Sequence, residues 1–142
     1  MTTILNKEQA NYIYHASYLS LCSCLYATYR NYYDFAFVTG IVFLTSINYW
    51  RNPINSYRRY IDITAVNTAL FYQNYRMYHA EYAQMYYTMM FFAFLSYLYG
   101  IHVYKKGDNW NSTYAHMGVH VFANIANMWV YGGDVPPINL IA

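Results

Sequence analysis

Charged residues divide this chain into long stretches that carry no charge. Three of these stretches cover residues 9–29, 82–104 and 109–133, and they are 21, 23 and 25 residues long. An α-helix rises 1.5 Å per residue, so about 20 residues are enough to cross the hydrocarbon core of a bilayer. The pattern therefore predicts three membrane-spanning helices.

Two further helices are predicted between the first and the second of these stretches. Residues 35–50 form a shorter run that contains the apolar sequence FAFVTGIVFL. Residues 59–76 include Asp62, Asn67 and Gln73, but the helices on either side require a segment that returns the chain. We expect an all-α fold, a polytopic transmembrane bundle of about five spans, in which residues 1–142 form a single domain.

The sequence also marks the ends of the last helix. Asn111 or Ser112 is expected to cap its N-terminus. Gly132 and Gly133 are expected to end it, and the two prolines that follow cannot continue a helix.

Composition supports a membrane location. Only 10% of the residues are charged, whereas a soluble domain has roughly 25%. The mean hydropathy of +0.04 is low for a membrane protein because hydropathy scales count tyrosine as polar, and the chain has 21 tyrosines. Tyrosine is amphipathic and suits a membrane interface. We expect a multi-pass membrane protein whose partners are lipids and other membrane subunits.

The distribution of basic residues predicts an orientation. If the spans alternate, six lysines and arginines fall on one side and two on the other. Basic residues concentrate on the cytoplasmic side of membrane proteins, so the N-terminus is expected inside. The chain has no basic arm or cluster, which argues against nucleic acid as a partner.

Several polar residues converge near the inner ends of the predicted helices. His116 and His120 are four residues apart, which places both imidazoles on one face of a helix, and Asn124 and Asn127 continue that face. Unsatisfied polar groups are costly in hydrocarbon, so this face is expected to point into the bundle. Asp62 is expected at the same level and needs a partner or a function there.

Imidazoles with a nearby carboxylate suit Zn²⁺, which activates water. In this interpretation His116 and His120 are ligands, Asp62 or His102 is the third ligand, and Ser46 lies near a bound water. The alternative is structural: Asp62 and the two histidines form a hydrogen-bonded lock between helices, or Asp62 pairs with Arg58 one turn earlier.

The order Ser46, Asp62 and then His116-Met117-Gly118-Val119-His120 resembles the CREST superfamily, which includes alkaline ceramidases and progestin/adiponectin-type receptors. The resemblance implies a zinc site in a lipid-amide hydrolase, with Ser46 and Asp62 as catalytic residues. Trp50 stands where that family has a third metal-binding histidine, and the family usually has seven helices. The tyrosine- and asparagine-rich composition resembles that of proteins from A+T-rich genomes, such as large DNA viruses and some protist organelles.

Two functions are therefore predicted, and a transporter or channel is a third, weaker option that no repeat or broken-helix pair supports. The first is a small polytopic membrane protein with a structural or subunit role in a membrane assembly. The second is a divergent metal-dependent membrane hydrolase that uses Asp62 and the two late histidines. The first is favoured because Trp50 replaces an expected ligand and the short loops leave little room for a substrate lid.

Overall fold

The computed structural model describes residues 4–137, and these residues form helices joined by short turns. The helices are α1 (Lys7–Ala16), α2 (Tyr18–Tyr29), α3 (Tyr33–Trp50), α4 (Tyr57–Met77), α5 (Ala83–Lys105) and α6 (Asn109–Gly132). The predicted all-α fold is confirmed. By mean hydropathy, none of the helices within the described residues is both long and apolar enough to cross a membrane.

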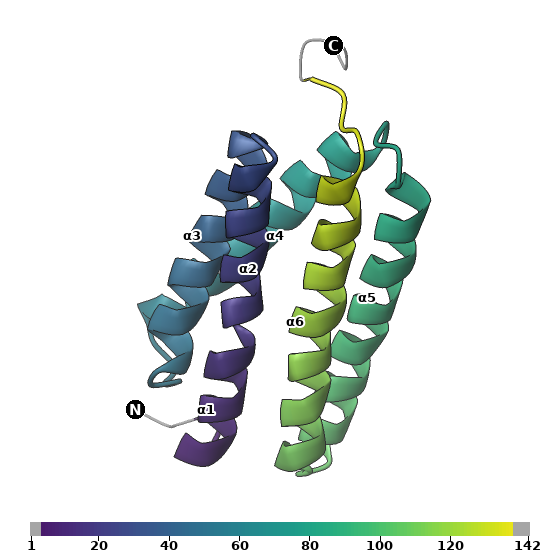
Figure 1. Ribbon diagram of the computed structural model, residues 1–142. Helices are drawn as coiled ribbons and strands as arrows, with labels where there is room; N and C mark the ends of the chain where they lie inside the picture. Colours follow the sequence, from purple (N-terminus) through teal and green to yellow (C-terminus); the bar gives the residue numbers. More distant parts are fainter. Residues whose placement is uncertain (1–3, 138–142) are drawn as a thin grey trace.

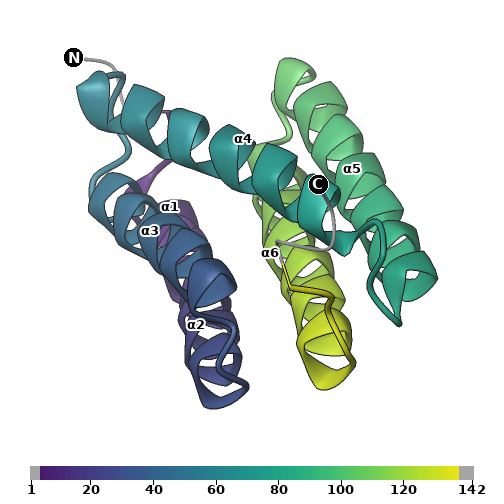
Figure 2. The same cartoon turned by 90° about the horizontal axis from the view of Figure 1, so that it is seen from above.

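The helices form two antiparallel pairs and one oblique helix. Figure 1 shows α1 and α2 nearly end to end, with α3 beside α2 and α5 beside α6. In the view from above, α4 crosses from the α3 side toward α5 (Figure 2). It packs chiefly on α3, whereas α6 contacts both α1 and α2. Helix α6 is therefore the element that joins the two pairs.

The first predicted helix is interrupted at Ser17, which differs from the single helix expected over residues 9–29. The Ser17 hydroxyl donates to the carbonyl oxygen of Ile13 at 3.0 Å, and the Ser20 N–H bonds to the Ser17 carbonyl, only three residues earlier. A serine that bonds back to the preceding turn bends a helix. The tightened turn at Ser17, with its bond from the Ser20 N–H, marks the boundary between α1 and α2.

Small residues bring α5 and α6 together. A β-carbon added at Gly100 would lie 3.2 Å from the β-carbon of Ala115, and one added at Gly118 would lie 3.0 Å from the Ser96 hydroxyl oxygen. Such small residues allow two helix backbones to approach closely. The pair α5–α6 is accordingly the most extensive helix contact in the described part of the chain.

Local chemistry explains the starts of α1 and α6. Asn6 caps α1 in a capping box with Gln9. The cap of α6 is Asp108, which corrects the predicted Asn111 or Ser112. Both the backbone and the side-chain amide of Asn111 donate to the Asp108 carboxylate, and these bonds lower the pKa of that carboxyl. The predicted end of α6 at Gly132 is confirmed.

Candidate functional site

Asp62 is held by two hydroxyl groups of α3. The hydroxyls of Ser46 and Thr45 donate to its Oδ1 atom at 2.8 and 2.9 Å. Asp62 is buried near the start of α4, and Ser46 is buried near the end of α3. Helix α4 follows α3 after a short turn and packs on it, so residues 16 positions apart meet near that turn. The predicted proximity of Ser46 and Asp62 is therefore present.

The predicted lock between Asp62 and the histidines is not formed. The one ion pair among residues 4–137 joins two other residues, and no hydrogen bond links Asp62 to His116 or His120. Arg58 does not pair with Asp62 either, because its guanidinium donates to the carbonyl oxygens of Asn48 and Asn52. The oblique path of α4 explains the difference, since it keeps the start of α4 on α3 and away from α6.

The two histidines of α6 pack in a row against Trp50 of α3. The ring centroids of Trp50 and His116 are 4.9 Å apart, and those of His116 and His120 are 5.3 Å apart. The indole thus occupies the space beside His116 where a third zinc ligand would have to lie. The Nε2 atom of His120 is buried and has no hydrogen-bond partner within the described residues.

The predicted three-ligand zinc site is not found. Among residues 4–137 no group of three or more histidine, cysteine, aspartate or glutamate side chains is arranged to hold a metal ion. His102 is exposed near the end of α5, on a helix whose main contact is with α6. Asp62 is occupied by the hydroxyls of α3, so neither residue completes a site with His116 and His120.

The inward orientation of the polar face of α6 is confirmed at Asn124 and Asn127, which are both buried. The Ser23 hydroxyl of α2 donates to Asn124 Oδ1 at 2.6 Å, and Asn124 Nδ2 donates to the His120 carbonyl oxygen at 2.7 Å. Asn124 is therefore a polar link between α2 and α6. Ile125, on the other face of the helix, is exposed.

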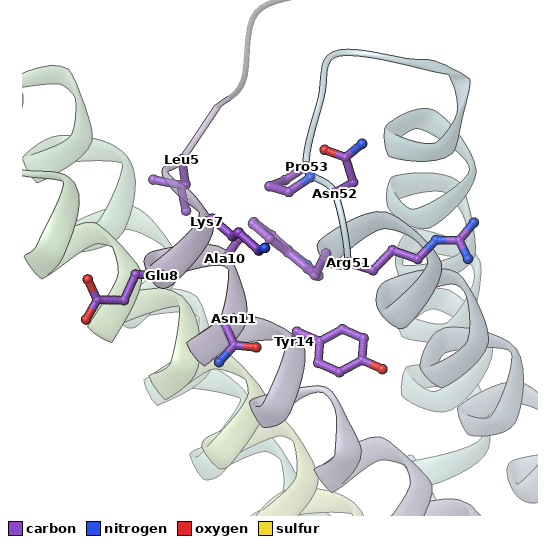
Figure 3. Close-up of a pocket in the computed structure, with 10 residues that line it drawn as sticks. Leu5, Lys7, Glu8, Ala10, Asn11, Tyr14, Arg51, Asn52 and Pro53 are labelled. Carbon is purple, nitrogen blue, oxygen red and sulfur yellow. The ribbon is translucent and has the colours of Figure 1, made fainter.

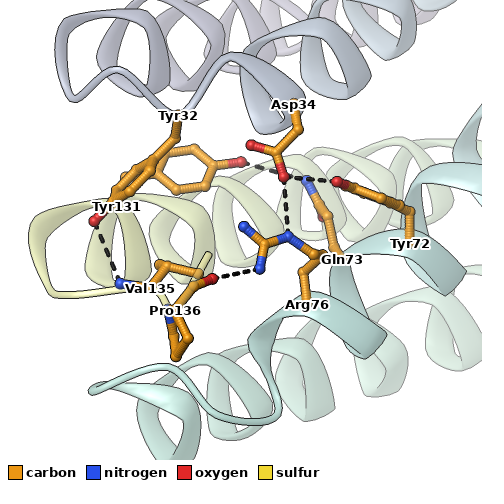
Figure 4. Close-up of polar contacts among 8 residues, drawn as sticks. All are labelled: Tyr32, Asp34, Tyr72, Gln73, Arg76, Tyr131, Val135 and Pro136. Carbon is orange, nitrogen blue, oxygen red and sulfur yellow. Dashed lines mark hydrogen bonds and ion pairs between the residues drawn. The ribbon is translucent and has the colours of Figure 1, made fainter. Parts of the chain in front are cut away.

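A polar network at the opposite end of the bundle was not predicted. The Arg76 guanidinium lies 3.0 Å from the Asp34 carboxylate, which also accepts a hydrogen bond from the Tyr72 hydroxyl at 2.6 Å (Figure 4). Arg76 also donates to the Pro136 carbonyl oxygen, beyond the end of α6. Burial alone would raise the pKa of Asp34, but the bonds from Tyr72 and Arg76 and the guanidinium charge outweigh it and lower that pKa.

This network could have been anticipated from the order of the charges. Asp34 begins one predicted helix and Arg76 ends the next, so an antiparallel pair places them at the same end. About one turn further along α4, Gln73 Nε2 lies 3.4 Å from the Tyr131 hydroxyl and extends the network to α6.

Hydrogen bonds also hold the segment that follows α6 at the end of the bundle where Asp34 and Arg76 lie. Arg30 and Tyr32 donate to the carbonyl oxygens of Gly132 and Gly133. Glu81 exchanges hydrogen bonds with Asp134, through its backbone N–H and its carboxylate. The turns α2–α3 and α4–α5 thus both hold the segment that follows α6.

A groove of about 950 Å³ lies at the other end, between the start of α1 and the turn from α3 to α4 (Figure 3). Its lining combines apolar and aromatic side chains with amide, basic and acidic ones, namely Leu5, Lys7, Glu8, Ala10, Asn11, Tyr14, Trp50, Arg51, Asn52 and Pro53. Trp50 therefore both lines the groove and contacts His116.

Comparisons with known proteins found no matching family model, no similar curated protein and no similar solved structure. The function must accordingly be argued from the residues and their arrangement.

Proposed function

We propose that this protein is an integral membrane protein, a polytopic helix bundle with a structural or subunit role in a membrane assembly. One observation carries the proposal: large apolar and aromatic side chains cover the outside of the bundle, while polar side chains fill much of its inside.

The exterior is rich in side chains that soluble proteins bury. Among the described residues 31 large hydrophobic side chains are exposed, and they occur on every helix. Phe71 and Tyr29 are each 80% exposed, and Phe37 is 69% exposed. Monomeric soluble proteins rarely expose contiguous apolar patches of more than a few hundred Å². Lipid tails and neighbouring apolar helices are suitable surroundings for this surface.

Tyrosine contributes much of that surface. It supplies 14 of the 31 exposed side chains. Its ring is apolar and its hydroxyl is polar, so tyrosine belongs to the residues that membrane proteins place at the level of the lipid headgroups.

The interior shows the complementary pattern. Arg76, Gln73 and Asn127 are no more than 6% exposed, and Ser23 is fully buried. In water-soluble folds such residues are mostly exposed. Membrane helix bundles turn polar side chains inward, where they bond across helices in place of water.

The placement of basic residues agrees with a single orientation. The start of α1, the turn α3–α4 and the turn α5–α6 lie at one end of the bundle (Figure 1). These segments, together with the start of α4 and the last residue of α5, contain six of the eight lysines and arginines. The positive-inside rule then predicts that this end faces the cytoplasm or its equivalent.

Membrane fractionation tests the proposal. We expect the expressed protein to stay in the membrane pellet after extraction at alkaline pH, where peripheral proteins are released. Release of the protein into the supernatant would contradict the proposal.

Cysteine labelling tests the orientation. The two native cysteines are first replaced by alanine, and single cysteines are introduced as Asn52→Cys, Lys106→Cys and His79→Cys, all at exposed positions. We expect Asn52→Cys and Lys106→Cys to react with an impermeant reagent from the inner side and His79→Cys from the outer side. Reaction of all three from the same side would contradict a spanning bundle.

The subunit role has its own test. After extraction in a mild detergent, native electrophoresis should show this chain in a species larger than its 16.9 kDa mass plus the micelle. Migration as a monomer with the mass of protein and micelle alone would contradict the subunit role and leave the membrane location unaffected.

A further inference from the structure

A line of polar side chains follows the inner face of α6 over most of its length. Its members are separated by four, four, three and four residues, which keeps them on one face of a helix. They span 15 residue steps, or about 22 Å at 1.5 Å per residue. The members are His116, His120, Asn124, Asn127 and Tyr131.

One end of this line lies beside the groove, and the other lies near the ion pair of Arg76 and Asp34. His116 contacts Trp50, which lines the groove at the end where the N-terminus lies. Tyr131 contacts Gln73, which is three residues from Arg76 of the charge pair at the opposite end. The Asp34 side chain of that pair is 25% exposed, so it can exchange protons with solvent.

Three buried polar atoms beside this line have no partner within residues 4–137: His120 Nε2, Asn127 Oδ1 and the Tyr86 hydroxyl. Tyr86 and Tyr131 are fully buried and belong to one core cluster. Tyr82 packs on Trp129 in the antiparallel pair α5–α6, so Tyr86, one turn further, lies near the level of Asn127.

Leaving a buried polar atom unpaired costs about 1 to 3 kcal/mol. Folded proteins usually meet this need with buried water, each molecule making about three hydrogen bonds. Three such atoms along one polar line are therefore suited to binding water.

We propose that the polar line on α6 binds water molecules and passes protons along the interior of the bundle, between Asp34 at one end and the groove beside Trp50 at the other. The inference rests on the proposed membrane location, because a proton path has a function only where it joins two compartments. Histidine relays are a recurrent use of ionisable side chains inside membrane proteins.

The chemistry of each step balances. A proton arrives on one nitrogen of His120 or on the oxygen of a water molecule or of Tyr131, and another proton leaves the same group for the next oxygen or nitrogen. Only N–H and O–H bonds form and break, and no redox partner is needed. Asn127 does not relay protons itself, but its Oδ1 can accept a hydrogen bond from water and so hold it in line.

Proton flux into vesicles tests the inference. The full-length protein is reconstituted in vesicles that contain a pH-sensitive dye, and a potassium diffusion potential set with valinomycin drives proton entry. We expect proton entry at least about tenfold faster than in protein-free vesicles. His120→Leu and Asn127→Leu should each lower this flux at least about fivefold, because a leucine removes a polar position and fills its space.

His102→Leu is the matched control, since it removes an exposed histidine that is not part of the line on α6, and it should keep the wild-type flux. The helix content of each variant is checked by circular dichroism, and Asn127→Leu decides the test if His120→Leu fails to fold. Wild-type flux equal to that of protein-free vesicles, or unchanged flux in the folded leucine variants, overturns the inference.

Insertion is measured on the same vesicles by alkaline extraction. Protein that resists extraction but passes no protons overturns the proton path alone. Protein that is released overturns the membrane location and the proton path together.

Discussion

The hydrogen bond between Ser23 and Asn124 offers a sharp test of the polar interior. The Ser23 hydroxyl is fully buried and donates to Asn124 Oδ1 at 2.6 Å, across the contact between α2 and α6. Ser23→Ala removes the donor with little change in volume and leaves the Asn124 oxygen buried without it. The other bond of the amide, from Nδ2 to the His120 carbonyl, remains.

The expected cost follows from these contacts. An acceptor left buried and unpaired costs about 1 to 3 kcal/mol. Alanine has a higher helix propensity than serine, which offsets up to about 0.5 kcal/mol. We therefore expect Ser23→Ala to lower the free energy of unfolding by about 1 to 2 kcal/mol, or roughly five- to thirtyfold in the equilibrium constant.

The assay is reversible unfolding of the purified protein in detergent, followed by circular dichroism. Ser20→Ala is the matched control, because Ser20 is buried on the same helix and its hydroxyl makes no hydrogen bond to the described residues. A double-mutant cycle with Asn124→Leu isolates the pair. In the Asn124→Leu background the cost of Ser23→Ala should disappear, since no acceptor is left unpaired.

Two results would refute this reasoning. One is an equal loss of stability for Ser23→Ala with and without Asn124→Leu, which would assign the loss to something other than the pair. The other is a loss for Ser20→Ala as large as that for Ser23→Ala, which would show that any buried serine on α2 behaves alike.

Two further substitutions test the end of the bundle at which α6 finishes. Arg76→Met leaves the half-buried Asp34 without its ion pair and should cost about 1 to 3 kcal/mol, less than a fully buried pair because Asp34 is partly exposed. The pKa of Asp34 is lowered in the folded protein, so the contribution of Asp34 to the free energy of unfolding is complete above its unfolded pKa of about 3.9 and is lost as pH falls through its folded pKa. Unfolding measured from pH 6 to pH 3 should show this loss of stability in the wild type and not in Asp34→Asn. Equal pH profiles for the two proteins would contradict it. Gly133→Ala places a β-carbon 2.6 Å from the Tyr82 ring and should lower the melting temperature, at a cost of about 1 to 3 kcal/mol. Gly132→Ala, whose β-carbon meets only an ordinary contact at 3.5 Å, should not lower it, and equal effects at the two glycines would contradict the clash.

Helix positions were predictable because they depend on local signals. The expected helices over residues 35–50, 59–76, 82–104 and 109–133 begin and end within about two residues of α3, α4, α5 and α6. Short turns with Asn52-Pro53 and Gly132-Gly133 separated them in the sequence. The break at Ser17 was missed because a single serine inside an uncharged run looks like any other small helical residue.

The candidate site was predictable only where residues share one helix or one antiparallel pair. His116, His120, Asn124 and Asn127 lie on one face of α6 because of their spacing alone. The contact of Ser46 with Asp62 followed from two neighbouring helices joined by a short turn. The link from Asp62 to the histidines required the path of α4 relative to α6, which no local pattern contains.

The sequence by itself determined the helices apart from the break at Ser17, their order and the polar face of α6, because spacing and turn residues act within a few positions. Tertiary structure alone decided which polar groups meet beyond neighbouring helices: Gln73 meets Tyr131, Arg76 meets the Pro136 carbonyl oxygen, and Asp62 does not meet the histidines of α6. The physical reason is the crossing of α4. A helix that lies obliquely brings its two ends to different neighbours, so the start of α4 stays on α3 while its end reaches Tyr131 of α6 and the segment that follows it.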